Sequence, residues 1–174
     1  MNPTTVSRVA ALGSRLRRLL ERLDREVLGI YQEAGERFEP SWFAVFTAVR
    51  DHGPLTVGEL AQRLGVSHAA VSQVRTALER ERLVHGAPDP RDGRRQFLSL
   101  TPKGHETARR LAPLWTAILD ATSRMLTEHA PTLLADLDAL ETALDQLGLR
   151  ARINASFSLE TPNDQMERAD DPPH

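Results

Sequence analysis

Residues 56–84 read TVGELAQRLGVSHAAVSQVRTALERERLV, and this stretch decides the fold. Thr56, followed three residues later by Glu59, forms the pattern of a capping box, which predicts the start of a helix. Gly65 ends that helix, and Ser67 is a favourable N-cap for a second one. Two helices joined by so short a glycine turn predict a helix-turn-helix unit.

The second helix of this pair, expected over residues 68–82, has two different sides. Val71, Val74 and Leu78 lie within about 60° of one another on the 3.6-residue period and are expected to pack against the first helix. The outward side is small and polar at its N-terminal end, as base reading in the DNA major groove requires. The predicted DNA contacts here are Ser67, His68, Ala69, Ser72, Gln73, Thr76 and Arg80. Because any amphipathic helix has a polar outer side, a purely structural helix pair remains the alternative.

A basic β-hairpin is predicted after the helix pair. Residues 88–93 (PDPRDG) form its turn, and residues 95–100 (RQFLSL) form its returning strand. An arginine at the tip of such a hairpin can enter the narrow, strongly negative minor groove. The predicted contacts at the tip are Arg91, Asp92, Arg94 and Arg95, with Asp92 holding Arg94 by a charge-assisted hydrogen bond. A solvated turn with incidental arginines is the alternative.

Helical patterns flank this unit on both sides. Apolar residues at three- and four-residue intervals predict helices over residues 6–35, 42–51, 102–128 and 132–147. Pro113 lies inside the third of these, which predicts a kink or a break. The predicted fold class is therefore mostly α with a small β-hairpin wing, a winged helix-turn-helix whose N- and C-terminal helices form a dimerisation region.

The predicted organisation has four parts. Residues 1–40 hold an N-terminal dimerisation helix, residues 41–104 the DNA-binding lobe, and residues 105–148 the C-terminal dimerisation helices. Residues 149–174 are expected to be a disordered acidic tail, because residues 155–174 carry five acidic residues against one basic.

A leucine stripe predicts dimerisation. The last predicted helix places leucines at alternating intervals of four and three, the narrow seam typical of helices that pair. An exposed stripe of this kind on a short helix must be covered. Packing against the first helix of the same chain is the alternative to a two-fold dimer. The predicted dimerisation residues are Leu12, Leu16, Leu133, Leu137, Leu140, Leu144 and Leu147.

The composition excludes several classes of protein. The 174 residues include no cysteine, which excludes a disulfide scaffold and a thiolate metal site. The net charge is −2, yet residues 54–104 hold eight basic and five acidic residues, a local charge of +3 that favours binding to a polyanion.

With neither a signal-peptide pattern nor a long apolar run, we expect a cytoplasmic protein that does not bind membranes. The sequence shows no catalytic signature and no close histidine spacing, so we expect no enzyme, cofactor or metal site.

Four stretches carry a family resemblance: residues 60–67 (LAQRLGVS), 78–84 (LERERLV), 89–95 (DPRDGRR) and 100–104 (LTPKG). Together they resemble the MarR-type (multiple antibiotic resistance regulator) transcription factors. The resemblance implies a homodimer that binds a pseudo-palindromic operator in double-stranded DNA. It also implies a repressor released by a small molecule, with Arg94 in the minor groove.

One position departs from the family pattern. Gln73 stands where many members carry arginine, so a base preference does not transfer to this chain. The alternative function is a winged-helix protein-interaction or nucleoid-type module that binds DNA without sequence specificity. A sequence-specific regulator prefers one palindrome, whereas the alternative binds any duplex of equal length with similar affinity.

The aromatic residues suggest a ligand site. Four of them come from predicted helices that meet between the dimerisation region and the DNA-binding lobe, where members of the family often bind small aromatic acids or phenols. The predicted ligand contacts are Tyr31, Trp42, Phe46 and Trp115. The alternative is that these side chains simply form the core.

Overall fold

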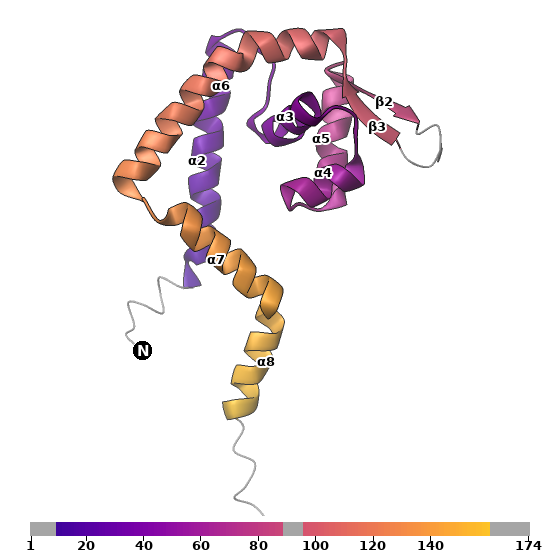
Figure 1. Ribbon diagram of the computed structural model, residues 1–174. Helices are drawn as coiled ribbons and strands as arrows, with labels where there is room; N and C mark the ends of the chain where they lie inside the picture. The colour runs from indigo at the N-terminus through magenta and orange to yellow at the C-terminus, as the bar shows by residue number, and fades with distance from the viewer. Residues whose placement is uncertain (1–9, 89–95, 161–174) are drawn as a thin grey trace, which may run out of the picture. The chain divides into compact units, whose positions relative to one another are not determined.

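The computed structural model describes residues 10–88 and 96–160 and confirms a mostly helical winged helix-turn-helix with a small antiparallel sheet (Figure 1). No helix in these two ranges is long and apolar enough to cross a membrane. In chain order the elements are α2 (Leu12–Glu33), η1 (Pro40–Trp42), α3 (Phe43–His52), β1 (Leu55–Thr56), α4 (Val57–Leu64), α5 (His68–Arg80), β2 (Val84–Pro88), β3 (Gln96–Leu100), α6 (Pro102–His129), α7 (Leu133–Gln146) and α8 (Leu149–Glu160).

The chain divides into two compact units, residues 1–118 and residues 119–174. The hydrophobic core belongs to the first unit and draws on its helices and its sheet. Its largest fully buried side chains include Phe46 of α3, Leu60 of α4, Leu78 of α5, Leu98 of β3 and Leu111 of α6. The core therefore ties the helix-turn-helix, the wing and the start of α6 into one body.

Local signals set the turn between α4 and α5 as predicted. The Oγ1 of Thr56 accepts the backbone N–H of Glu59 at 3.2 Å, and the Glu59 carboxylate accepts the backbone N–H of Thr56 at 2.8 Å. This is the complete capping box. Gly65 then adopts a left-handed φ of 65°, which glycine tolerates without steric cost. Ser67 caps α5 by accepting the N–H of Ala70 at 3.2 Å.

The wing hairpin is also confirmed. Strand β2 pairs antiparallel with β3, with Val84 opposite Leu100 and Pro88 opposite Gln96. Strand β1 pairs with the other edge of β3 and was not predicted. A strand of two residues is too short to show the alternation by which strands are recognised in a sequence.

Helix α6 continues through Pro113, so the alternative of a break at this residue is wrong. Proline removes one backbone hydrogen bond and crowds the preceding turn. Leu111 and Trp115, on either side of Pro113, are both buried in the core. We attribute the continuity of the helix to the packing energy of these two side chains, which outweighs the loss of one backbone hydrogen bond.

The expected disordered tail is wrong for residues 149–160, which form α8. The guanidinium of Arg152 donates to the carbonyl oxygens of Leu147, at 2.8 Å, and Ala143, at 2.6 Å. These bonds satisfy carbonyls at the end of α7 and hold the first turn of α8 against them. The acidic composition of residues 155–174 hid this helix, and residues 161–174 lie outside the described part of the chain.

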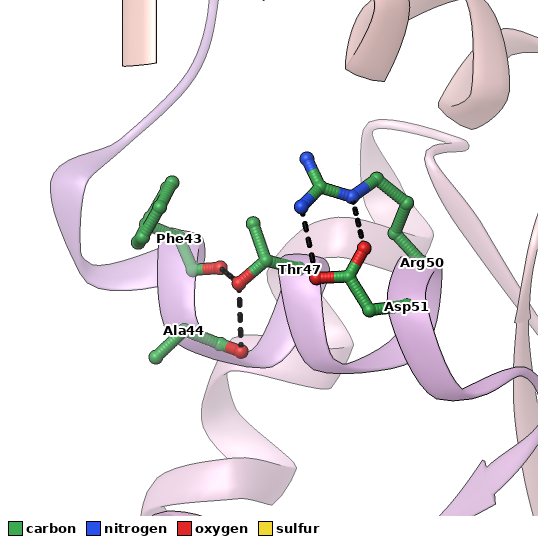
Figure 2. Close-up of polar contacts among 5 residues, drawn as sticks. All are labelled: Phe43, Ala44, Thr47, Arg50 and Asp51. Atoms are coloured by element: carbon green, nitrogen blue, oxygen red, sulfur yellow. Dashed lines mark hydrogen bonds and ion pairs between the residues drawn. The ribbon is translucent and has the colours of Figure 1, made fainter. Parts of the chain in front are cut away.

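Helix α3 carries several polar contacts (Figure 2). The hydroxyl of Thr47 donates to the carbonyl oxygen of Phe43 at 2.7 Å. The guanidinium of Arg50 binds both carboxylate oxygens of Asp51, at 2.6 and 2.9 Å, which lowers the pKa of Asp51 and raises that of Arg50. Arg50 also lies 5.4 Å from the ring centroid of Trp115, so a cation–π contact joins α3 to α6.

Candidate nucleic-acid interface

The outward side of α5 is the centre of the candidate interface. On the inward side, Val71 and Leu78 are buried and Val74 is half-buried, so packing against α3 and α4 fixes which side faces solvent. The seven predicted contacts of this helix and its N-cap are all exposed: Ser67, His68, Ala69, Ser72, Gln73, Thr76 and Arg80. This side carries no acidic, lysine or arginine residue over its first turns and ends in a cation at Arg80, a surface that can lie close to a base edge.

The wing supplies the second part of the candidate interface. Because Pro88 pairs with Gln96, the seven residues between them are the connection that joins the two strands of the hairpin. The predicted contacts Arg91, Asp92, Arg94 and Arg95 are in this connection, outside the described residues. Their assignment stays a prediction from the sequence.

A concave surface of about 1230 Å³ lies between α4, α5 and β3. Its lining includes Gln62 of α4, His68 and Arg75 of α5 and Gln96 of β3. The Nε of Arg75 donates to the carboxylate of Glu79 at 3.0 Å, which restrains its guanidinium beside the concavity. Gln62, Arg75 and Gln96 are not among the predicted contacts, because residues on three different elements have no common spacing along the chain.

The four aromatic residues predicted to bind a ligand form part of the core instead of an open site. Tyr31, Trp42, Phe46 and Trp115 are all buried, and each has its ring centroid within 5.3–5.7 Å of that of Phe38. The Nε1 of Trp115 donates to the Tyr31 hydroxyl at 3.1 Å. Burial raises the pKa of Tyr31, and this hydrogen bond partly opposes the shift. Phe38, the centre of the cluster, was missed because it lies between the predicted helices.

A second cavity of about 450 Å³ lies beside Trp42, between the start of α3 and the buried side of α5. Trp42 and Val45 line one wall, and Val66, Val74 and Gln73 line the other. The lining carries no charged side chain. Gln73 therefore belongs both to this cavity and to the predicted DNA-contact set.

The ion pair between Arg110 and Glu36 anchors the loop after α2 to α6. One nitrogen of Arg110 lies 3.0 Å from a Glu36 oxygen, and a second bond joins the Nε to the other oxygen. The hydrogen bonds from Arg110 lower the pKa of Glu36. Among the residues that the structure describes, no cluster of three or more histidine, cysteine, aspartate or glutamate side chains is placed to hold a metal ion.

The predicted dimerisation residues remain largely uncovered within the single chain. Leu133 is half-buried; the exposed members are Leu12 and Leu16 of α2, Leu137, Leu140 and Leu144 of α7, and Leu147 at the end of α7. Exposed apolar surface of this extent is typical of sites that contact another protein.

Sequence comparisons find regulators of transcription. The sequence profile of the MarR family matches residues 38–95. The chain is 36% identical over 62 residues to the HTH-type transcriptional repressor NicR of Pseudomonas putida, a match that covers 36% of this chain and 39% of NicR. It is 30% identical over 89 residues to the HTH-type transcriptional repressor MdtR of Bacillus subtilis (51% of this chain, 56% of MdtR). It is 41% identical over 76 residues to the HTH-type transcriptional regulator Rv2034 of Mycobacterium tuberculosis (43% of this chain, 68% of Rv2034). The chain thus spans about two-fifths of NicR and just over half of MdtR.

Solved structures share the fold. The Bordetella bronchiseptica protein BpsR, whose DNA binding is regulated by 6-hydroxynicotinic acid, superposes with a TM-score of 0.54 at 24% identity, covering 74% of this chain and 91% of BpsR. The Streptomyces coelicolor transcriptional regulator PcaV, solved with its natural ligand, gives a TM-score of 0.54 at 23% identity, covering 73% of this chain and 89% of PcaV. At these identities the likeness concerns the fold.

Proposed function

The chain belongs to the MarR family, and from this premise we propose that it is a homodimeric, sequence-specific DNA-binding repressor of transcription acting in the cytoplasm. The observation that carries the proposal is the exposed, small and polar outer side of α5, held beside the wing hairpin by a shared core. The named relatives, which are regulators and not enzymes, support it.

Each subunit reads DNA with two elements. The outer side of α5 enters the major groove, where Ser72 and Gln73 reach base edges. The wing places Arg94 in the adjacent minor groove. The concavity between α4, α5 and β3 receives the sugar-phosphate strand that separates the two grooves, with Arg75 as its cation. In a two-fold dimer the two α5 helices lie about 34 Å apart and contact the two halves of a pseudo-palindrome.

Selecting bound fragments from random double-stranded DNA tests the function itself. We expect one pseudo-palindromic motif with half-sites about 10 base pairs apart, because the two α5 helices of the dimer contact the same side of the duplex. Recovery of fragments with no common motif would contradict sequence-specific reading and would support the nucleoid-type alternative.

Replacing Arg94 by alanine should weaken operator binding and flatten its salt dependence. Removing one cation per subunit lowers the slope of log K against log [salt] by about one phosphate-equivalent per subunit. The measurement is a titration of the selected operator at several salt concentrations. The matched control is Arg124→Ala, which removes an exposed arginine of α6 outside the candidate interface and should leave the slope unchanged. Wild-type affinity of the Arg94→Ala variant at every salt concentration would refute the wing assignment.

We further propose that a small aromatic ligand releases the repressor and that it binds in the cavity beside Trp42. The volume of about 450 Å³ lies within the ~300–1,000 Å³ range of small-molecule sites. The uncharged lining favours a neutral aromatic such as a phenol over an aromatic acid. Because Gln73 lines the cavity and is also a predicted DNA contact, a bound ligand would contact a residue of the candidate interface and thereby compete with its contact to a base.

An NMR titration with phenol as the probe should shift the backbone amides of Val66 and Gln73, and benzoate should leave them in place. Ala44→Leu fills part of the cavity and should abolish these shifts. Ala112→Leu, an equal change at an exposed position of α6, should preserve them. Phenol-induced shifts confined to residues outside the cavity lining would refute this ligand site.

A further inference from the structure

The second compact unit lacks a core of its own. Across residues 119–157, whose side chains the structure describes, none is buried. Helices α7 and α8 have 14 and 12 residues. Isolated helices shorter than about 12–15 residues are marginal in water, and helices gain most of their stability from a packed apolar face. Another surface must therefore cover this unit.

Helix α8 has an apolar stripe of its own. Leu149, Ile153 and Phe157 follow one another at four-residue intervals, which places them on one side of the helix. Their exposed fractions are 61%, 45% and 70%. The two hydrogen bonds from Arg152, to the carbonyls of Ala143 in α7 and of Leu147 just after it, fix the start of α8 directly after α7. The stripe therefore adds about two and a half turns of exposed apolar surface beyond the end of α7.

The charges of α7 and α8 are complementary. Helix α7 carries four acidic residues and no basic one: Asp136, Asp138, Glu141 and Asp145. Residues 149–157 of α8 carry Arg150 and Arg152 and no acidic residue. Because Arg152 is held by carbonyls of its own chain, Arg150 is the α8 cation that can meet a carboxylate of another α7. An α8 helix thus matches an α7 helix in both respects, since an apolar stripe meets leucines and a cation meets acidic residues.

We propose that α8 is a second dimerisation arm, whose stripe of Leu149, Ile153 and Phe157 packs on the α7 helix of a second copy of the chain. The proposal rests on the homodimer of the proposed function and adds an interface in a segment whose composition predicts a disordered tail. Two-fold symmetry forms the contact twice per dimer, so each arm secures the partner's α7.

Paired substitutions on opposite sides of α8 test the arm in the full-length protein. Ile153→Asp with Phe157→Asp should weaken the dimer at least tenfold in sedimentation equilibrium, because two carboxylates would face the partner's leucines. Ala151→Asp with Ala155→Asp places the same charges on the opposite side and should change the dissociation constant less than twofold. Far-ultraviolet circular dichroism verifies that both variants stay folded. Equal dissociation constants for the two variants overturn the arm.

Cysteine trapping tests the identity of the partner surface, since the natural chain has no cysteine. Chains carrying Phe157→Cys are mixed with chains carrying Leu137→Cys, Leu140→Cys or Leu144→Cys, and the mixtures are oxidised. We expect a mixed disulfide with at least one α7 position. Phe157→Cys chains that link only to one another overturn the α7 contact. If Ile153→Asp with Phe157→Asp leaves the dissociation constant of the dimer unchanged while Leu140→Asp is monomeric, the arm is wrong and the homodimer stands.

Discussion

Replacing Leu140 by aspartate should convert the protein to a monomer and remove its high-affinity operator binding. Leu140 lies in the middle of the α7 seam and is 58% exposed in the single chain. Burying an unpaired carboxylate in an apolar interface costs several kcal/mol, and two-fold symmetry places two of them there. A monomer contacts only one half-site. It therefore loses the affinity that a dimer gains when its two linked α5 helices bind both half-sites together.

Sedimentation velocity measures the mass of this variant, and titration with the selected operator measures its affinity. Ala135→Asp is the matched control, because this exposed residue lies on the opposite side of α7 from the seam. The control should remain a dimer and bind the operator as the wild type does. A Leu140→Asp protein with the mass of a dimer would exclude the α7 seam as the interface.

Replacing Gly104 by alanine should destabilise the first unit by about 1–3 kcal/mol, the usual cost of overpacking a core. Gly104 is buried near the start of α6, and an added Cβ would overlap the carbonyl oxygen of Leu83 and lie 3.3 Å from the Cβ of Leu100. That carbonyl accepts the backbone N–H of Thr101 at 3.0 Å, so it cannot turn away without losing a hydrogen bond. Urea denaturation measures the change in the free energy of unfolding.

Gly29→Ala is the control for this experiment. Gly29 is also inside a helix, but an added Cβ meets no atom within 4 Å. Alanine there should stabilise the protein by about 0.5–1 kcal/mol, because it lowers the entropy that the chain loses on folding. The same glycine-to-alanine substitution is therefore expected to lower the free energy of unfolding at position 104 and to raise it at position 29. Equal unfolding free energies for wild type and Gly104→Ala would show that α6 and Leu83 can separate freely.

Much of the candidate interface was predictable because its signals are local. The period of α5 alone separates Val71 and Leu78, which are buried, from Ser72 and Gln73, which are exposed. The concavity between α4, α5 and β3 was not predictable. Arg75 and Gln96 both line it, although they are 21 positions apart in the chain and on different elements. No spacing in the sequence indicates that these two residues line the same surface.

The sequence by itself determined where the helices and turns around α5 begin and end. Thr56, Gly65 and Ser67 act on backbone groups within about four residues of themselves, so their effect is the same in any tertiary context. Tertiary structure alone decided the role of Phe38 as the centre of the aromatic cluster and the unbroken passage of α6 through Pro113. Both depend on side chains brought together from distant parts of the chain, whose packing energy overrides local preference.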